Sequence, residues 1–153
     1  MFEKCTSLVT PPIIKAMEFP KRACYEMFKG CTSLTSTVDL SVTYCEEEAF
    51  LLMYTMCDSL TEGSIRIKAA DKNAVCGIFR DCPNLTKATV EVLGGGTMYF
   101  NDLFGNDTKL RIIYLTMPHI NNRSYMVCNF GVDQGESLDI YFKVLNYPTD
   151  AET

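Results

Sequence analysis

The sequence predicts an α/β solenoid of about six coils of 25–26 residues, with a parallel sheet on one face and short helices on the other. Three observations support this prediction. One pattern recurs along the whole 153-residue chain, an apolar segment with helical spacing precedes the leucine of each copy, and an alternating segment follows it. A repeat of this length is too small to fold alone and must bury its apolar face against its neighbours. The whole chain, residues 1–153, is therefore expected to form a single solenoid domain.

Each of the first four copies of the repeat carries an aromatic residue, then a cysteine, then a leucine. In the second copy Phe28 leads to Cys31 and Leu34. The leucines of the first five copies are Leu8, Leu34, Leu60, Leu85 and Leu110. The fifth copy has Asp107 in place of the cysteine, and the last copy, residues 128–153, is degenerate. A degenerate terminal copy is typical of a cap, so this segment is expected to close the C-terminal end.

The segment before each leucine predicts a short helix. Cys24, Met27, Phe28 and Cys31 stand at positions i, i+3, i+4 and i+7, and the same spacing recurs 26 residues later. This spacing places apolar side chains on one side of a helix. We therefore expect a helix in each coil on the face opposite the sheet.

The segment after each leucine predicts a strand. Residues 64–68, 89–92 and 140–144 alternate between apolar and polar side chains, with many β-branched and aromatic residues. A period of two is typical of a half-buried strand. One such strand per coil, always in the same direction, builds a parallel sheet along the solenoid.

The side chains that point away from the core along this sheet form a continuous surface, which is the expected binding face. Its selected members are Asp39, Arg66, Glu91, Tyr114, Thr116, Tyr141 and Lys143. The row mixes both signs of charge and ends in two tyrosines, which supply large contact area with a polar tip and suit contact with a protein or a glycan. A solvated face without a partner is the alternative, since these positions would be polar in either case. A register shift of one residue would also exchange inner and outer positions.

The eight cysteines are expected to be mainly buried thiols. Cys5, Cys31, Cys57 and Cys82 stand at intervals of 26, 26 and 25 residues, so they occupy one site in successive coils. Buried thiols pack as small hydrophobic groups. One or two disulfides remain an alternative, because strands roughly 4.8 Å apart bring cysteines within bridging distance. A zinc site is not expected, because no C-x-x-C pair exists and His119 is the single histidine.

Composition excludes several classes of function. The net charge is −5, from 14 basic and 19 acidic residues, without a basic cluster. Nucleic acid and anionic membrane surfaces are therefore poor partners. No apolar run approaches the roughly 18 residues of a membrane-spanning helix, so no membrane insertion is expected. No motif assembles an acid, a base and a nucleophile, so we expect neither an enzyme nor a cofactor or metal requirement.

The recurring Met-Phe, Cys and Ser-Leu elements, each followed by a strand, resemble the bacterial BspA-like leucine-rich repeats. The resemblance covers essentially the whole chain and is clearest in the first four copies, while Asp107 departs from the pattern and the copies are slightly longer than usual. It implies a curved, right-handed leucine-rich-repeat solenoid. It also implies a cell-surface or secreted protein, including phage-encoded ones, that binds other macromolecules. The matching residues are core residues, so no catalytic residue is transferred.

We therefore expect a non-catalytic adhesion or recognition module that binds a protein or a glycan through the exposed sheet face. The alternative is a structural spacer segment of a longer surface or phage tail protein. The chain begins at full motif strength with no leader peptide, which indicates a piece of a longer cell-surface or secreted protein. The first coil has no visible cap, so self-association through this N-terminal coil is expected to be available.

Overall fold

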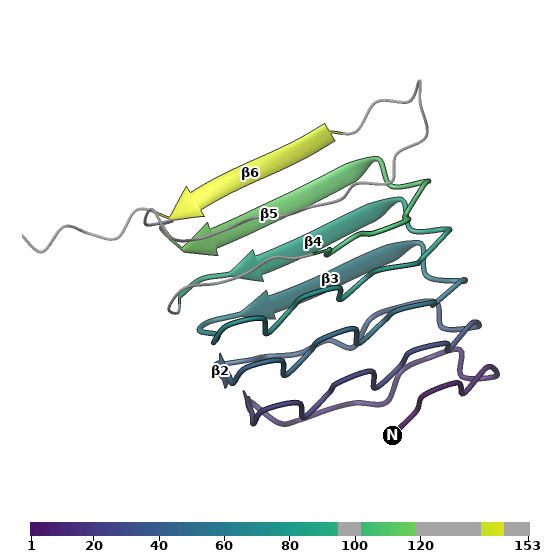
Figure 1. Cartoon of the computed structure of the whole chain (residues 1–153), viewed down its shortest axis with the longest axis horizontal. Helices are drawn as coiled ribbons and strands as arrows, with labels where there is room; N and C mark the ends of the chain where they lie inside the picture. The colour runs from purple at the N-terminus through teal and green to yellow at the C-terminus, as the bar shows by residue number, and fades with distance from the viewer. Residues whose placement is uncertain (95–101, 119–138, 146–153) are drawn as a thin grey trace, which may run out of the picture.

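The computed structural model describes residues 1–94, 102–118 and 139–145. In these ranges the chain winds into a β-solenoid of about four turns, each stacked on the one before (Figure 1). The solenoid architecture and its parallel sheet are confirmed. The prediction of about six coils is not: the described residues form about four turns. Of the degenerate copy at 128–153, only residues 139–145 fall within the described ranges.

The main sheet has four parallel strands in chain order. These strands are β3 (Glu62–Ile67), β4 (Lys87–Val92), β5 (Ile112–Pro118) and β6 (Asp139–Leu145). A two-stranded parallel pair, β1 (Glu18–Phe19) and β2 (Tyr44–Cys45), precedes it. An isolated bridge between Val42 and Ile67 joins the two parts. The sequence therefore predicted the location and direction of the long strands, although β3 and β4 begin two residues earlier than expected.

The strands of the main sheet pair without a register slip. Ile65 pairs with Val90, and Val90 pairs with Leu115, so each inward side chain packs beside its equivalent in the next coil. In β3 the residues alternate strictly between exposed and buried. The predicted assignment of inner and outer positions is thus correct for β3, β4 and positions 113–116 of β5, and the alternative of a one-residue shift does not occur among them. In β6, Ile140 is 46% exposed although its register partner Ile113 is buried.

The prediction of short helices is wrong for the described residues, none of which is helical. Opposite the sheet, the chain forms a ribbon of consecutive turns. Every fourth residue of this ribbon has a left-handed backbone, as at Arg22, Glu26 and Gly30, whose φ values are 61°, 50° and 71°. A residue in this conformation interrupts an α-helix, so a helix cannot run through these positions.

Backbone hydrogen bonds explain why the ribbon replaces a helix. The amide of Tyr25 donates to the carbonyl three residues back, at 3.2 Å. The amides of Cys24 and Phe28 instead donate to the carbonyls of Ala49 and Met53 in the next coil, at 2.8 and 2.9 Å. An α-helix keeps these bonds within itself. The ribbon divides them between local turns and bonds that join one coil to the next.

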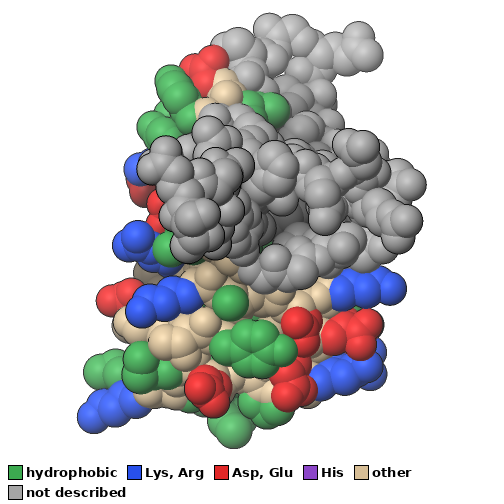
Figure 2. All heavy atoms as spheres, turned by 90° about the vertical axis from the view of Figure 1, so that its left-hand side faces the viewer, with side chains coloured by type: hydrophobic (Ala, Val, Ile, Leu, Met, Phe, Trp, Pro, Cys, Tyr) green, Lys and Arg blue, Asp and Glu red, His purple; other side chains and the backbone are tan. Residues whose placement is uncertain are grey.

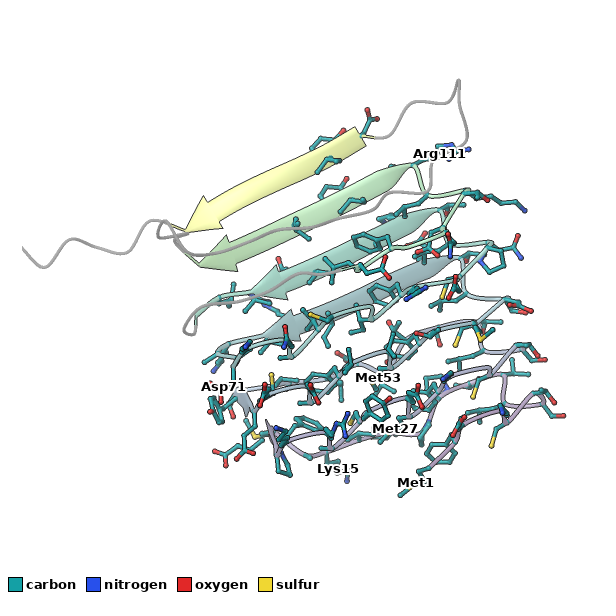
Figure 3. The ribbon with its side chains drawn as sticks, viewed as in Figure 1. Met1, Lys15, Met27, Met53, Asp71 and Arg111 are labelled. Carbon is teal, nitrogen blue, oxygen red and sulfur yellow. The ribbon has the colours of Figure 1, made fainter. Side chains whose placement is uncertain are left out.

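The core lies between the sheet and the turn ribbon, where Figure 3 shows side chains from both. Its main feature is a stack of one aromatic ring per coil, with neighbouring centroids 5.5–6.1 Å apart and nearly parallel rings. The rings belong to Phe2, Phe28, Tyr54, Phe79 and Phe104. The leucines of the second to fifth copies are buried in the same core. The repeated aromatic and leucine positions therefore exist to fill a continuous core.

The seven described cysteines are free thiols, and six of them are buried. Their thiols also connect coils: Cys31 Sγ donates to the Phe2 carbonyl at 2.9 Å, and Cys57 Sγ donates to the Phe28 carbonyl at 3.2 Å. Burial raises the pKa of the Cys57 thiol to about 12, so it stays protonated and able to donate. The expectation of buried thiols is confirmed for these residues, while Cys128 lies outside the described ranges.

Candidate functional site

The exposed face of the main sheet carries three parallel rows of side chains, because its strands pair in register. The central row consists of Ser64, Thr89, Tyr114 and Tyr141. The row nearer the start of the strands consists of Glu62, Lys87, Ile112 and Asp139. The row nearer their end consists of Arg66, Glu91 and Thr116, and Lys143 of β6 stands in backbone register with Thr116. Side chains from four coils are thereby brought onto one surface.

The central row ends in a pair of stacked tyrosines. The rings of Tyr114 and Tyr141 lie 4.9 Å apart and are inclined by 15°. The two residues are 40% and 54% exposed, although large aromatic side chains are usually mostly covered. Stacking restricts the rotation of each ring, so the pair would lose less conformational freedom when a ligand binds.

Ion pairs flank the central row on both sides. Lys87 Nζ lies 3.2 Å from Glu62 Oε2, and Arg66 Nε lies 3.1 Å from Glu91 Oε2. The pairs are largely in water, so each stabilises the fold by no more than about 1 kcal/mol. Their main effect on the face is electrostatic, since they leave this part of it without net charge.

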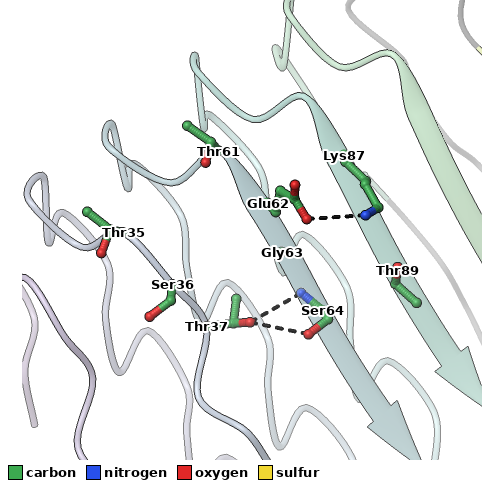
Figure 4. A pocket seen from close by; sticks show the side chains of 9 residues that line it. All are labelled: Thr35, Ser36, Thr37, Thr61, Glu62, Gly63, Ser64, Lys87 and Thr89. Atoms are coloured by element: carbon green, nitrogen blue, oxygen red, sulfur yellow. Dashed lines mark hydrogen bonds and ion pairs between the residues drawn. The ribbon is translucent and has the colours of Figure 1, made fainter.

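A groove of about 500 Å³ opens between the second coil and the start of β3 and β4 (Figure 4). It is lined by Thr35, Ser36, Thr37, Thr61, Glu62, Gly63, Ser64, Lys87 and Thr89. The Thr37 hydroxyl accepts a hydrogen bond from the Ser64 amide at 3.2 Å and lies 3.4 Å from the Ser64 hydroxyl. The groove forms because residues 35–41 of the second coil lie outside any strand and do not continue the sheet at this point.

The predicted binding residues are placed as follows. Arg66 and Glu91 meet as an ion pair, and Tyr114 and Tyr141 meet as a stack. Thr116 lies half-buried beside Glu91 in the next strand.

The other two predicted residues are Asp39 and Lys143, one outside the strands and one on β6. Asp39 is exposed but lies outside the strands, in the second coil. Lys143 lies on β6 in register with Thr116, and its side chain falls outside the described part of the structure.

Sequence reasoning missed most of the groove. A threonine follows the leucine in three successive copies, as Thr35, Thr61 and Thr86, and this recurrence was the available signal. The hydroxyl of Thr35 donates to the Val9 carbonyl at 3.2 Å, and Thr86 donates to the Thr61 carbonyl at 3.0 Å. These threonines thus bridge adjacent coils while they also border the face.

Asp107 is the most perturbed acidic group in the described ranges. It replaces the repeat's cysteine and is only 1% exposed. Its Oδ1 accepts a hydrogen bond from the Cys82 amide at 2.7 Å, while Oδ2 is buried without a hydrogen-bond partner. Burial raises the pKa of Asp107 to about 8, against the lowering effect of that hydrogen bond. Nearby Asp81 and Asp102 raise it further.

Other surfaces carry mixed charge. Figure 2 views the side of the solenoid where the strands end, and red, blue and green side chains are interspersed there. Lys21 pairs with Glu47 at 2.8 Å, and Arg22 pairs with Glu48 at 2.7 Å. In the described residues, no group of three or more His, Cys, Asp or Glu side chains is arranged to hold a metal ion. His119 lies outside those residues.

Comparisons with protein-family models, with curated proteins and with solved structures found no match. Within the described ranges, no helix is long and apolar enough to cross a membrane.

Proposed function

We propose that this protein is a non-catalytic binding module that recognises a protein or a glycan through the exposed face of its parallel sheet. The observation that supports this most is the stacked, solvent-exposed pair of Tyr114 and Tyr141. Exposed aromatic rings cost free energy in water and contribute strongly when a partner covers them. The ion pairs and hydroxyls around them supply the polar surroundings that a binding surface needs.

The test is binding to an array of immobilised glycans and to a peptide display library. A double variant, Tyr114→Ala with Tyr141→Ala, should weaken binding of the selected ligand by about tenfold to a hundredfold, because two central aromatic contacts are lost. Tyr44→Ala is the matched control, since Tyr44 is 39% exposed but lies on β2, outside the four-stranded sheet. Equal affinity of the wild-type protein and the double variant would overturn this function.

A structural spacer is the second candidate. It is supported by the unbroken aromatic stack from Phe2 to Phe104 and by the backbone bonds between coils, which suit a stiff segment. In either role, we propose that the protein acts at the cell surface or outside the cell as part of a longer protein. A spacer would bind nothing on the glycan array and nothing in the peptide library, although it would be folded.

The first coil offers a further contact surface, for a second copy of this chain. Met1, Val9, Ile13 and Met17 are exposed there, at 94%, 53%, 86% and 52%. Apolar side chains gathered on one terminal coil favour association, because contact removes them from water. We propose that this surface drives self-association of the isolated protein.

A further inference from the structure

The groove and the tyrosine pair lie next to each other. Thr89 borders the groove and pairs in register with Tyr114 on the neighbouring strand. Tyr141, on the strand beyond, covers one face of the Tyr114 ring. Thr89 is the register neighbour of Tyr114 on the side away from Tyr141, and its side chain is too small to cover a phenol ring. The Tyr114 side chain is 40% exposed. The lining of the groove therefore ends at Thr89, one strand short of the exposed Tyr114 ring, which we call the aromatic wall.

The lining of the groove selects a ligand by its chemistry. Hydroxyl groups predominate, and they belong to Thr35, Ser36, Thr37, Thr61, Ser64 and Thr89. Each hydroxyl can donate and accept a hydrogen bond. The two charged side chains in the lining, Glu62 and Lys87, neutralise each other at 3.2 Å. The fitting ligand is therefore uncharged and carries many donors and acceptors of its own.

Other ligand classes fit this groove less well. A polyanion would find one lysine, which Glu62 already pairs. An apolar peptide segment would remove the hydroxyls from water without replacing their hydrogen bonds, which is unfavourable. A sugar ring has hydroxyls at its rim and C–H groups on its face, so it matches both the groove and the aromatic wall. The volume of about 500 Å³ lies within the usual range of small-ligand sites.

We propose that this groove is a subsite for a neutral saccharide, whose hydroxyls bind the threonine and serine side chains and whose ring packs on the open face of Tyr114. The proposal rests on the proposed function and narrows it to one ligand class. Tyr141 acts here as a positioning residue, because it holds the Tyr114 ring in its stacked orientation from the far side.

The experiment compares short neutral oligosaccharides, acidic oligosaccharides and display-selected peptides as probes of the full chain. The neutral oligosaccharide with the strongest array signal is then titrated by isothermal titration calorimetry, whose signal does not depend on the tyrosine that the variants replace. Tyr114→Ala should weaken its binding about tenfold or more, whereas Tyr114→Phe should retain most of it, since the ring face is kept.

A second variant keeps the test decisive if Tyr114→Ala fails to fold. Thr89→Val preserves the branched shape that suits a strand and removes one groove hydroxyl, so it should weaken saccharide binding several-fold without lowering stability. Tyr44→Ala should leave binding unchanged. Unfolding curves of all variants establish which are folded.

The outcomes separate this proposal from the broader function. The wild-type protein could bind a peptide or an acidic glycan but no neutral saccharide, with this binding abolished in the double variant of Tyr114 and Tyr141. That result would overturn the saccharide subsite but would still support binding through the sheet face. Neutral-saccharide binding that Tyr114→Ala and Thr89→Val both leave unchanged would also overturn the subsite. Binding of no probe to the wild-type protein would overturn both.

Discussion

Replacing Asp107 with asparagine should remove a large part of the pH dependence of stability. Asp107 is buried, one of its oxygens has no hydrogen-bond partner, and burial raises its pKa to about 8. Its pKa in the unfolded chain is close to the ordinary value of 3.8. Between these two values the folded protein holds a proton at this site that the unfolded chain has released. The free energy of unfolding therefore falls as pH rises from about 4 to about 8, and it is then constant with respect to this group.

The size of this effect follows from the two pKa values. Each pKa unit corresponds to about 1.4 kcal/mol, so the rise from 3.8 to about 8 corresponds to roughly 6 kcal/mol. This figure is a ceiling, because water entry and local relaxation lower the cost of a buried charge. The buried thiols contribute little below about pH 8, because their ordinary pKa of 9.0 keeps them protonated in the unfolded chain as well. Burial raises the pKa of Cys24 to about 11 and those of Cys45 and Cys57 to about 12 in the folded protein, so their own loss of stability begins near pH 9 and is shared by the wild type and Asp107→Asn.

Urea unfolding at pH 5 and at pH 8.5 measures the effect. The wild-type protein should lose several kcal/mol between the two conditions, and Asp107→Asn should lose much less. Asp107→Cys restores the residue of the first four copies and should also be more stable than the wild type at pH 8.5. Asp58→Asn is the control, because Asp58 is exposed in the equivalent turn of the third coil. Parallel pH profiles of the wild type and Asp107→Asn would refute this reasoning.

Three further changes test the packing. Leu60→Ala should lower the free energy of unfolding in urea by roughly 2–5 kcal/mol, because Leu60 is fully buried in a middle coil. Leu8→Ala should lower it by less, because Leu8 is only half-buried. Equal losses of stability in the two variants would show that a partner covers the first coil. Gly63→Ala should cost about 1–3 kcal/mol, since a Cβ at this position would lie 2.6 Å from the Phe79 ring, and an unchanged unfolding midpoint would contradict that contact. Ile13→Asp should shift sedimentation toward the monomer if the exposed first coil self-associates, whereas a wild type that is monomeric at every concentration would rule this out.

The sheet could be predicted from the sequence because its signal is local and unambiguous. The alternation around Ile65 and Val90 fixes which side chains point inward, and the constant spacing between coils fixes the register. The outward positions, including Tyr114 and Tyr141, followed from the same alternation. Once the strands are paired, the register places Tyr114 beside Tyr141, and their stacking follows from that placement.

The turn ribbon could not be predicted in the same way. Apolar residues at i and i+4, such as Cys24 and Phe28, fit both a helix and a ribbon with a four-residue turn. The difference lies in residues that adopt positive φ, and most of these, such as Arg22 and Glu26, are not glycines, so composition gave little warning. Hydrogen bonds between coils decide whether this segment forms a helix or a turn ribbon, and these bonds depend on tertiary contacts rather than on the local sequence.

The groove was hidden for a related reason. Its side chains come from the second coil, where residues 35–41 form no strand, and from the first residues of β3 and β4. An alternating pattern identifies neighbours within a sheet but does not locate the place where a coil leaves it. The threonine that follows the leucine in three successive copies marked the edge of the face without revealing the groove.

Recognition through the sheet face is tested most directly by mapping a ligand's footprint on the protein. Backbone amide chemical shifts would be measured with and without the ligand selected on the glycan array or from the peptide library. The largest changes should fall along the central row, at Ser64, Thr89 and Tyr114, with little change in the turn ribbon around Tyr25 and Met56. A footprint confined to the turn ribbon or to the first coil would contradict binding at this face.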